Sequence, residues 1–527
     1  MQYISIAFLG FTVVSLALYW LVPQKARAYI LLAASLFFYA LNAKWLLLPI
    51  LALTAVVYGC SVWIGKKDAA FAAAKKDMPR EERKSAKQKL KKKKQGILLL
   101  ECAAAFGMLI VFKYTGFLAG TLNAALSLFT KAAVPIPTLL LPLGISYYTL
   151  SVVSYAADVY YGKVQPEKNP LKLLTYATYF PHIVEGPIAS YAPFSKQLDA
   201  PNALTFDRFL RAAERILVGL LKKMIIADRA GMAADVVFSH PGEYHFIAAA
   251  GGIVLYAVQL YFDFAGCIDL VRGVSELFGI ELAENFRRPF FSRSVQEFWR
   301  RWHMTLGGWI RNYIFYPLSL TKWNTRLTTK AGTIKNAYFR STLPMLLPLL
   351  FVWLFTGIWH GASWKYVLYG LYYYIILASG LLFEPVFALV CKKLHIRRES
   401  GAYHVFQILR TDLLVLAGLT LFRADTVRQA GRILLSVFQI GAIVPELAGL
   451  KDASTLSILD FALLLIGTAA FAVLSVCEEK KEFNLFDALE KRPAVRWLFV
   501  TAAILAVIAL GVYGAGYTAK PFVYAQF

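Results

Sequence analysis

Long apolar runs recur along the whole chain, and they constrain its fold more strongly than any other feature. About eleven of them approach or reach the length that a helix needs to cross a bilayer core, which is roughly 20 residues. Only 17% of the 527 residues are charged and 58% are hydrophobic, so lipid must act as solvent for much of the surface. The sequence therefore predicts an all-α, polytopic membrane helix bundle in a lipid bilayer. The expected spans are 3–22, 29–43, 45–64, 97–118, 139–161, 246–270, 342–360, 366–390, 405–422, 456–476 and 496–514.

Two segments are too polar and too often broken by Pro and Gly to be simple spans. They are residues 174–232 and 286–320, and both are rich in aromatic side chains. Irregular backbone at membrane depth is tolerated only where protein or water surrounds it. These segments are expected to form re-entrant or interfacial elements around a central funnel and tunnel. Residues 209–223 combine apolar positions at helical spacing with a basic opposite face, which predicts an amphipathic helix along the cytoplasmic interface.

The positive charge lies mainly in short segments between the apolar runs. The formal net charge is +24, and residues 66–94 alone contain 13 Lys or Arg and 4 Asp or Glu. Cytoplasmic loops collect Lys and Arg, so this loop is predicted to be cytoplasmic, with anionic-lipid contact as a second interpretation. The same pattern argues against a nucleic-acid partner. It places both termini outside the cell and His360 in the outer half of the membrane.

Two histidines are candidates for chemistry, in a chain that has only 7. His360 is the only titratable side chain between Arg340 and Lys365. An ionisable residue inside a membrane span is a functional-site hypothesis, although a histidine bonded to a backbone carbonyl is the alternative. Imidazole takes and returns protons near neutral pH, so His360 is predicted to be a general base, assisted by His303.

A metal site is the competing use of these histidines, and the spacing does not favour it. Neither His303 nor His360 has a Cys, His or carboxylate three or four residues further on. The five cysteines are scattered and are expected to be small packing residues. The prediction is that no metal and no cofactor is bound.

Three further residues are candidates for supporting roles. Trp302 precedes His303 in a Trp- and Arg-rich stretch, where an interfacial aromatic belt is the alternative interpretation. Asp263 and Glu185 are carboxylates in apolar surroundings. Each can position a catalytic histidine or satisfy neighbouring helix ends, and the structural role is the favoured one.

Six stretches resemble, in order, the motifs of the membrane-bound O-acyltransferase family. Within that family they are most similar to the bacterial branch of alginate and peptidoglycan O-acetylation proteins, and to the related teichoic-acid D-alanyl transfer protein. One departure is Ala265-Gly266-Cys267-Ile268-Asp269, where relatives more often have Ser-Gly-Tyr-Ser-Asp. The stretches are residues 141–149, 180–188, 261–266, 298–305, 356–361 and 421–425.

The resemblance implies an activity and assigns residues to it. The family's essential histidine falls on His360 and its second histidine on His303. The implied reaction moves an acyl group, with acetyl favoured, from a cytoplasmic thioester (acetyl-CoA or an acyl carrier) to a hydroxyl of an extracellular cell-wall glycan or exopolysaccharide. An external partner of the SGNH or serine esterase type and a bacterial plasma-membrane location are also implied.

The C-terminal tail carries the pattern Phe522-x-Tyr524-x-x-Phe527. In the family such a tyrosine is thought to accept the acyl group, so Tyr524 is predicted to be a covalent relay. Without the family, an aromatic interfacial anchor is the simpler interpretation. The expected divisions are N-terminal helices with the basic loop (1–96), a catalytic core (97–430), C-terminal helices (431–514) and the external tail (515–527).

Other functional classes remain open at this point. D-alanyl transfer to teichoic acid is the alternative within the family. Outside it, a transporter of acyl groups or lipid-linked saccharides and a non-catalytic scaffold would also be polytopic and basic. A transporter is expected to show internal repeats, and none is evident in the sequence.

Overall fold

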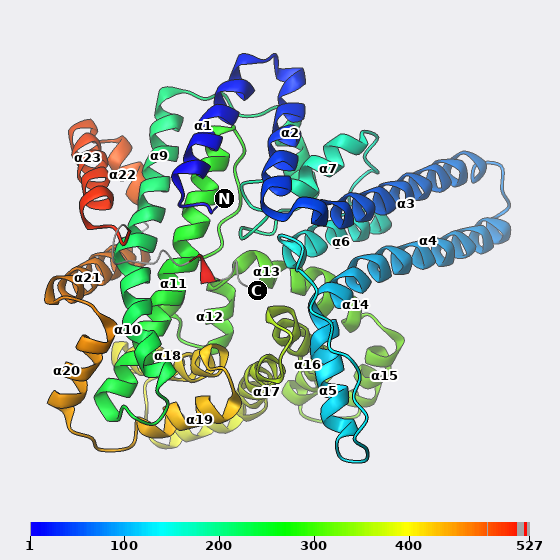
Figure 1. The fold of residues 1–527 in the computed structure, drawn as a ribbon. Coiled ribbons are helices and arrows are strands. Elements are labelled where there is room, and N and C mark those ends of the chain that lie inside the picture. Colours follow the sequence, from blue (N-terminus) through cyan, green and yellow to red (C-terminus); the bar gives the residue numbers. More distant parts are fainter. Residues whose placement is uncertain (1, 482, 514–520, 524–527) are drawn as a thin grey trace. The chain divides into compact units, whose positions relative to one another are not determined.

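The computed structural model describes residues 2–481, 483–513 and 521–523, and all regular structure within these ranges is helical. This confirms the all-α prediction. The chain forms two compact units (Figure 1). The first unit comprises Met1–Phe209 and Val274–Ala283, and the second comprises Leu210–Gly273 and Glu284–Phe527. Helices α9 (Phe206–Leu221) and α11 (Phe246–Leu277) carry the chain between them.

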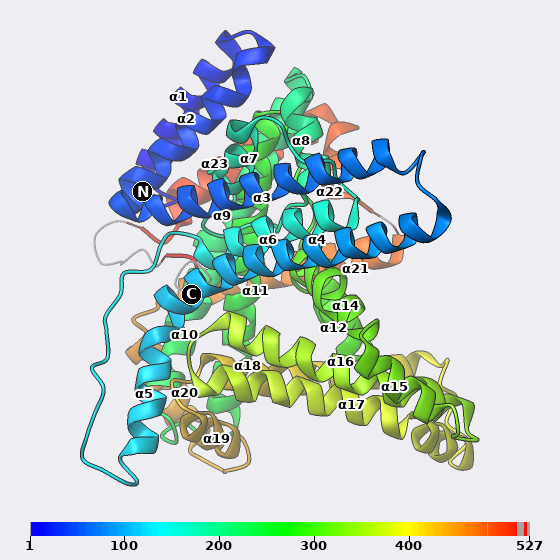
Figure 2. The ribbon, with the colours of Figure 1, turned by 90° about the vertical axis from the view of Figure 1, so that its right-hand side faces the viewer.

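In the first unit the longest helices lie side by side as a hairpin, α3 against α4, with α6 packed on both (Figure 2). The expected basic loop at 66–94 is mostly helix, because α3 ends at Ala74 and α4 begins at Arg80. Its lysines therefore extend two helices beyond their apolar parts, and only residues 75–79 turn the chain. The helices of this unit are α1 (Ile6–Leu21), α2 (Gln24–Ala43), α3 (Leu47–Ala74), α4 (Arg80–Leu109), α5 (Thr115–Leu126), α6 (Ile145–Tyr161), α7 (Pro170–Thr178) and α8 (Tyr191–Asp199).

The number of membrane-length helices differs from the eleven spans expected. Among the residues that the structure describes, eight helical segments are long and apolar enough to cross a membrane. Segment Gln24–Ala74 merges two expected spans, and α1 is shorter than the others. The expected span at 139–161 is wrong, because the helix begins only at Ile145 and is buried from there to Val159. Its Ser, Thr and Tyr side chains face protein on every side, so α6 is a core helix of the first unit.

In the second unit, α16 and α17 run side by side and α18 packs against α17 (Figure 1). The stretch expected to be broken, 286–320, consists of short helices and a π-helical segment at Arg311–Phe315. The further helices are α10 (Asp228–Ser239), α12 (Val295–Arg301), α13 (Met304–Ile310), α14 (Tyr316–Ser319), α15 (Lys322–Ala331), α16 (Ala337–His360), α17 (Trp364–Lys393), α18 (Gly401–Arg423), α19 (Val427–Ser436), α20 (Ile443–Ser454), α21 (Ile458–Lys481), α22 (Leu485–Glu490) and α23 (Pro493–Leu510).

Glycines bring α16 and α17 into backbone contact one turn before His360. A Cβ atom on Gly357 would lie 2.2 Å from the Tyr366 carbonyl oxygen, and one on Gly370 would lie 2.3 Å from the Trp353 carbonyl oxygen. Small residues at a helix crossing allow close van der Waals packing, which is a main source of association between membrane helices. This crossing fixes the end of α16 that carries His360.

A second glycine contact joins α9 to α11. A Cβ atom on Gly219 would lie 2.6 Å from the Gly266 carbonyl oxygen. The helices therefore meet almost backbone to backbone. The segment that follows α9, Lys222–Ala227, is π-helical and runs beside α11. This contact brings its lysines within reach of carboxylates on α11.

We expect Gly370→Ala to destabilise the second unit, because its methyl group has no room against the Trp353 carbonyl. Overpacking of this kind costs about 1–3 kcal/mol. Gly380→Ala in the same helix is the matched control, since nothing lies within 4 Å of that position. Thermal unfolding in detergent should show a lower transition temperature for Gly370→Ala alone. Equal transition temperatures for the two variants would contradict the tight crossing.

Candidate active site

His360 is the last residue of α16 and is buried. Its Nδ1 atom lies 2.6 Å from the carbonyl oxygen of Thr356, one turn earlier in the helix. A carbonyl oxygen only accepts hydrogen bonds, so Nδ1 carries a proton and donates it. In the neutral ring Nε2 is then the basic nitrogen. A hydrogen bond to a backbone carbonyl is what a purely structural histidine would form, and His360 forms it. The same hydrogen bond selects the tautomer that a general base requires.

His303 lies between α12 and α13, in a left-handed backbone conformation with φ of 45°. Such a conformation is unfavourable for a residue other than glycine and persists where the surroundings hold it. Asn285 supplies that hold. Its Oδ1 accepts hydrogen bonds from His303 Nδ1 at 3.1 Å, from Thr305 N at 3.1 Å and from Thr305 Oγ1 at 2.9 Å. The Asn285 carbonyl oxygen also accepts from Met304 N at 2.9 Å.

The structure brings the two histidines together within one aromatic shell. The Trp359 ring centre lies 6.0 Å from His303 and 5.0 Å from His360. Phe264 meets His303 edge-on at 4.9 Å, and Phe422 meets His360 at 5.4 Å. Burial lowers the pKa of His303 well below its usual range, and the charge of His360 lowers it further. His303 is therefore neutral near pH 7, and the imidazole of His360 is its neighbour in the shell.

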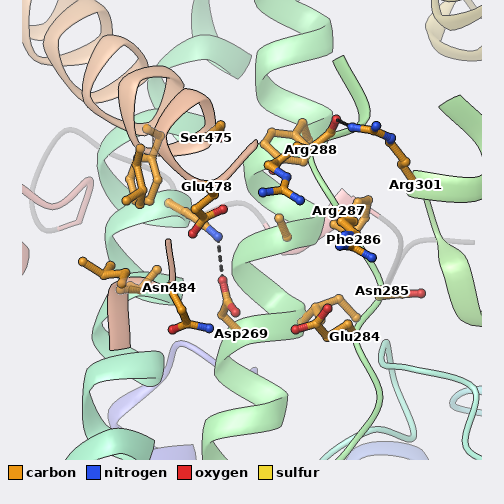
Figure 3. A pocket seen from close by; sticks show the side chains of 18 of the residues that line it. Asp269, Glu284, Asn285, Phe286, Arg287, Arg288, Arg301, Ser475, Glu478 and Asn484 are labelled. Atoms are coloured by element: carbon orange, nitrogen blue, oxygen red, sulfur yellow. Dashed lines mark hydrogen bonds and ion pairs between the residues drawn. The ribbon is translucent and has the colours of Figure 1, made fainter. Parts of the chain in front are cut away.

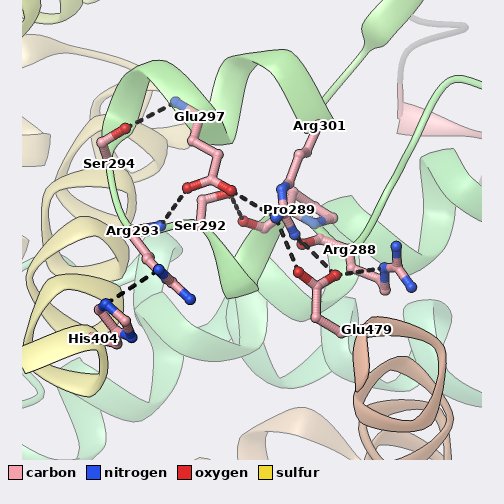
Figure 4. A network of polar contacts seen from close by, with 9 residues as sticks. All are labelled: Arg288, Pro289, Ser292, Arg293, Ser294, Glu297, Arg301, His404 and Glu479. Carbon is pink, nitrogen blue, oxygen red and sulfur yellow. Dashed lines mark hydrogen bonds and ion pairs between the residues drawn. The ribbon is translucent and has the colours of Figure 1, made fainter. Parts of the chain in front are cut away.

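A polar network anchors α12, the helix that leads into Trp302 and His303 (Figure 4). Ser294 caps the helix by accepting a hydrogen bond from Glu297 N at 3.1 Å. The Glu297 carboxylate accepts from Arg301 at 2.6 Å and from Arg293 N at 2.9 Å. Glu479 on α21 holds Arg301 at 3.0 Å and Arg288 at 2.9 Å. These ion pairs tie α12 to α21. The turn that carries His303 therefore follows a helix whose position is fixed.

A charged cavity of about 880 Å³ reaches the same turn, since both Asn285 and Met304 line it (Figure 3). Seven basic and five acidic side chains line it, so its electrostatic character is positive. Asp269 on α11 pairs with Lys222 at 2.6 Å across the wall. Arg287 and Arg300 form no ion pair within the part of the chain that the structure describes. The charged lining is Arg215, Lys222, Arg272, Arg287, Arg288, Arg300, Arg301, Asp269, Glu284, Glu297, Glu478 and Glu479.

The other predicted site residues have different surroundings. Trp302 stacks on Phe298 at 5.5 Å and belongs to the aromatic core of the second unit. Asp263 is buried and accepts from Lys223 Nζ at 2.6 Å. Glu185 is buried in the first unit. Tyr524 lies outside the described residues.

The basic face expected for residues 209–223 is not solvated. The helix is present as α9, but Arg215 and Lys223 are buried, and Glu214 forms a buried ion pair with Arg496. The prediction of a basic interfacial surface was therefore wrong at these positions, because carboxylates from other helices pair with them. The ion pair of Lys223 could have been predicted from the sequence, since a lysine next to an apolar run needs an acidic partner in a facing span. Asn285 has no distinguishing pattern around it.

No group of three or more His, Cys, Asp or Glu side chains within the ranges that the structure covers is arranged to hold a metal ion. The site consists instead of two imidazoles with defined Nδ1 partners, an aromatic shell and a charged cavity at its edge. A chain whose described regular structure is all helical, with several membrane-length helices, is a polytopic membrane protein.

Comparison with known proteins specifies the class. Residues 167–331 match the profile of MBOAT, the membrane-bound O-acyltransferase family. A probable alginate O-acetylase AlgI of Pseudomonas syringae pv. tomato is 31% identical over 462 residues, which are 88% of this chain and 79% of that protein. The chain belongs to the membrane-bound O-acyltransferase family, and it is an O-acyltransferase.

Other relatives act on different acceptors. A peptidoglycan O-acetyltransferase of Helicobacter pylori is 31% identical over 53% of this chain and 54% of that protein. A teichoic acid D-alanyltransferase of Bacillus subtilis is 32% identical over 46% of this chain and 59% of that protein. These names confirm the predicted branch of the family.

We expect Asn285→Ala to reduce acyl transfer at least tenfold, because it removes the acceptor shared by His303 and Thr305. Each buried donor left without an acceptor costs about 1–3 kcal/mol, so the strained turn should relax. Asn324→Ala is the control, since Asn324 is also buried in the second unit and its amide donates to Ser319. Transfer assays on both purified variants test this. Undiminished transfer by Asn285→Ala would show that the turn keeps His303 in place without the amide.

Proposed function

We propose that this protein transfers an acyl group, with acetyl as the first choice, from a cytoplasmic thioester to a hydroxyl outside the cell. His360 acts as the general base and His303 assists it. The observation that carries this proposal is the bond from His360 Nδ1 to the Thr356 carbonyl, which leaves Nε2 as the basic nitrogen in a buried aromatic shell. A well-placed general base contributes roughly 10²–10⁴-fold to the rate.

The charged cavity is the proposed entry for the acyl donor. Its lining includes residues 478, 479 and 483–486, and the basic segment around them is predicted to be cytoplasmic. Arg287 and Arg300 offer positive charge to the anionic groups of a coenzyme A or carrier-bound donor. Asn285 and Met304 both line the cavity, and both belong to or hold the His303 turn, so the donor could reach this turn from the cavity. The thioester would thus reach the histidines from the cytoplasmic side.

The proposed reaction has two balanced steps. In the first, His360 Nε2 takes the proton of the Tyr524 hydroxyl as its oxygen attacks the thioester carbonyl. The carbon–sulfur bond breaks, and the imidazolium returns the proton to the departing thiol. In the second, the acceptor hydroxyl attacks the tyrosyl ester, the acyl group moves to it, and Tyr524 recovers a proton. The tail carries the acyl group between a donor from inside and an acceptor from outside.

The acceptor is proposed to be a cell-wall glycan or exopolysaccharide. The acetyl-transferring relatives cover more of this chain than the D-alanyl-transferring one, which favours acetyl. D-alanyl transfer to teichoic acid is the second candidate because of that 32% identical relative. An external SGNH or serine esterase-like partner, a bacterial plasma-membrane location and a catalytic core at 97–430 complete the proposal.

His360→Ala is expected to lower acyl transfer by about 10²–10⁴-fold, because it removes the base while leaving a small cavity in a large bundle. His303→Ala is expected to have a smaller effect of the same sign. His240→Ala is the matched control, since its Nδ1 also bonds the carbonyl four residues earlier, that of Val236, at 2.9 Å. The measurement is transfer from a labelled acyl donor by protein in nanodiscs. A rate for His360→Ala within tenfold of the parent would rule out the general-base assignment.

Tyr524→Phe is expected to abolish transfer to the glycan, because it deletes the hydroxyl that carries the acyl group and keeps the aromatic ring. Tyr513→Phe is the control, as an exposed tyrosine near the end of α23. Mass spectrometry of the C-terminal peptide should detect an acylated Tyr524 in the parent protein when the acceptor is withheld. Normal glycan acylation by Tyr524→Phe would contradict the relay role of Tyr524 and favour an aromatic interfacial anchor.

A further inference from the structure

The last described residues, Pro521–Val523, are anchored inside the second unit. Phe522 is 4% exposed, and Lys223 Nζ lies 4.9 Å from the centre of its ring. Val523 N donates a hydrogen bond to Asp263 Oδ2 at 2.7 Å. A chain end is normally mobile unless something ties it down. Here a buried carboxylate and a buried ammonium do so.

Asp263 divides its two oxygens between different partners. Oδ1 accepts from Lys223 Nζ at 2.6 Å, and Oδ2 accepts from Val523 N. Lys223 also pairs with Asp228 at 2.8 Å, so one buried ammonium faces two carboxylates. Burial of ions is expensive unless their remaining hydrogen-bonding sites are filled. The tail backbone fills the site on Asp263 that Lys223 leaves open.

The chain that leaves α23 is held near Lys222–Ala227 before it reaches Asp263. Arg229 donates to the Leu510 carbonyl oxygen at 2.7 Å, and Val512 N donates to the Met224 carbonyl oxygen at 3.1 Å. Lys222–Ala227 is π-helical, a geometry that is frequent at functional sites. Hydrogen bonds therefore hold the C-terminal segment at three points: at Leu510, the last residue of α23, at Val512 just after it, and at Val523 just before Tyr524.

We propose that Asp263 and Lys223 form a clasp for the protein's own C-terminal segment, and that this clasp positions Tyr524 for acyl transfer. The proposal rests on the relay function of Tyr524. Val523 packs against the aromatic cluster that contains Tyr369 and Phe422, and both of these rings contact His360. Tyr524 follows Val523 directly, with about 3.8 Å between successive Cα atoms. Asp263 and Lys223 are thus positioning residues that act through the tail.

The clasp itself is tested without measuring activity. Chymotrypsin cuts after Phe522 only when that residue leaves its buried position, and the mass of the product identifies the cut. Asp263→Asn has one acceptor oxygen for two donors, so we expect cleavage after Phe522 to be about tenfold faster. Glu214→Gln, which also alters a buried ion pair, should leave this cleavage unchanged. Equal cleavage of the parent and Asp263→Asn would overturn the clasp.

A second pair of variants changes the tail alone, so folding of the bundle is not at issue. Val523→Pro removes the N–H that binds Asp263, whereas Val523→Ala keeps it. We expect transfer to fall at least about tenfold for the proline variant and to stay within a few-fold for the alanine variant. Equal transfer by both would overturn the positioning role. If Tyr524→Phe transfers normally while Phe522 remains protected, the relay fails and the clasp stands.

Discussion

Charged side chains in the interior of a membrane protein need partners from the protein itself, and this constraint organises the second unit. Three of its carboxylates pair with cations that arrive from other elements of the fold. Asp263 and Asp269 on α11 receive the adjacent lysines Lys223 and Lys222, and Glu214 on α9 receives Arg496 of α23. These pairings specify which helices lie together, because a mispaired arrangement would leave charges exposed to lipid or hydrocarbon.

The histidine site depends on the same constraint. One amide oxygen of Asn285 accepts three hydrogen bonds and so holds a turn that the backbone would otherwise avoid. Aromatic rings surround both histidines, and a hydrogen bond in such low-dielectric surroundings is stronger than it would be in water. The aromatic shell therefore strengthens the hydrogen bonds to Asn285. These hydrogen bonds in turn fix the His303 ring that the shell encloses.

The sequence was most informative where one residue type is rare or one pattern is long. The length of the apolar runs predicted the helical fold class. The scarcity of titratable side chains around His360 identified this histidine as a candidate site residue. The sequence was misleading for α6, which it predicted to be part of a membrane span. Hydropathy does not distinguish a helix buried in protein from one that faces lipid. Asn285 was not predictable, since it acts through distances to a turn 18 residues away along the chain. Asp263, the partner of Lys223 on α11, is 40 residues distant along the chain, and the crossing of α9 and α11 brings the two together.

The glycine crossing of α16 and α17 has a consequence for how such a protein works through a catalytic cycle. Helices whose backbones touch have no side-chain layer that can yield, so neither can slide or rotate without breaking the contact. The imidazole at the end of α16 is accordingly a stationary part. Movement during turnover must then come from the molecules that approach it. The reacting groups of the substrates therefore have to approach an imidazole whose position is fixed.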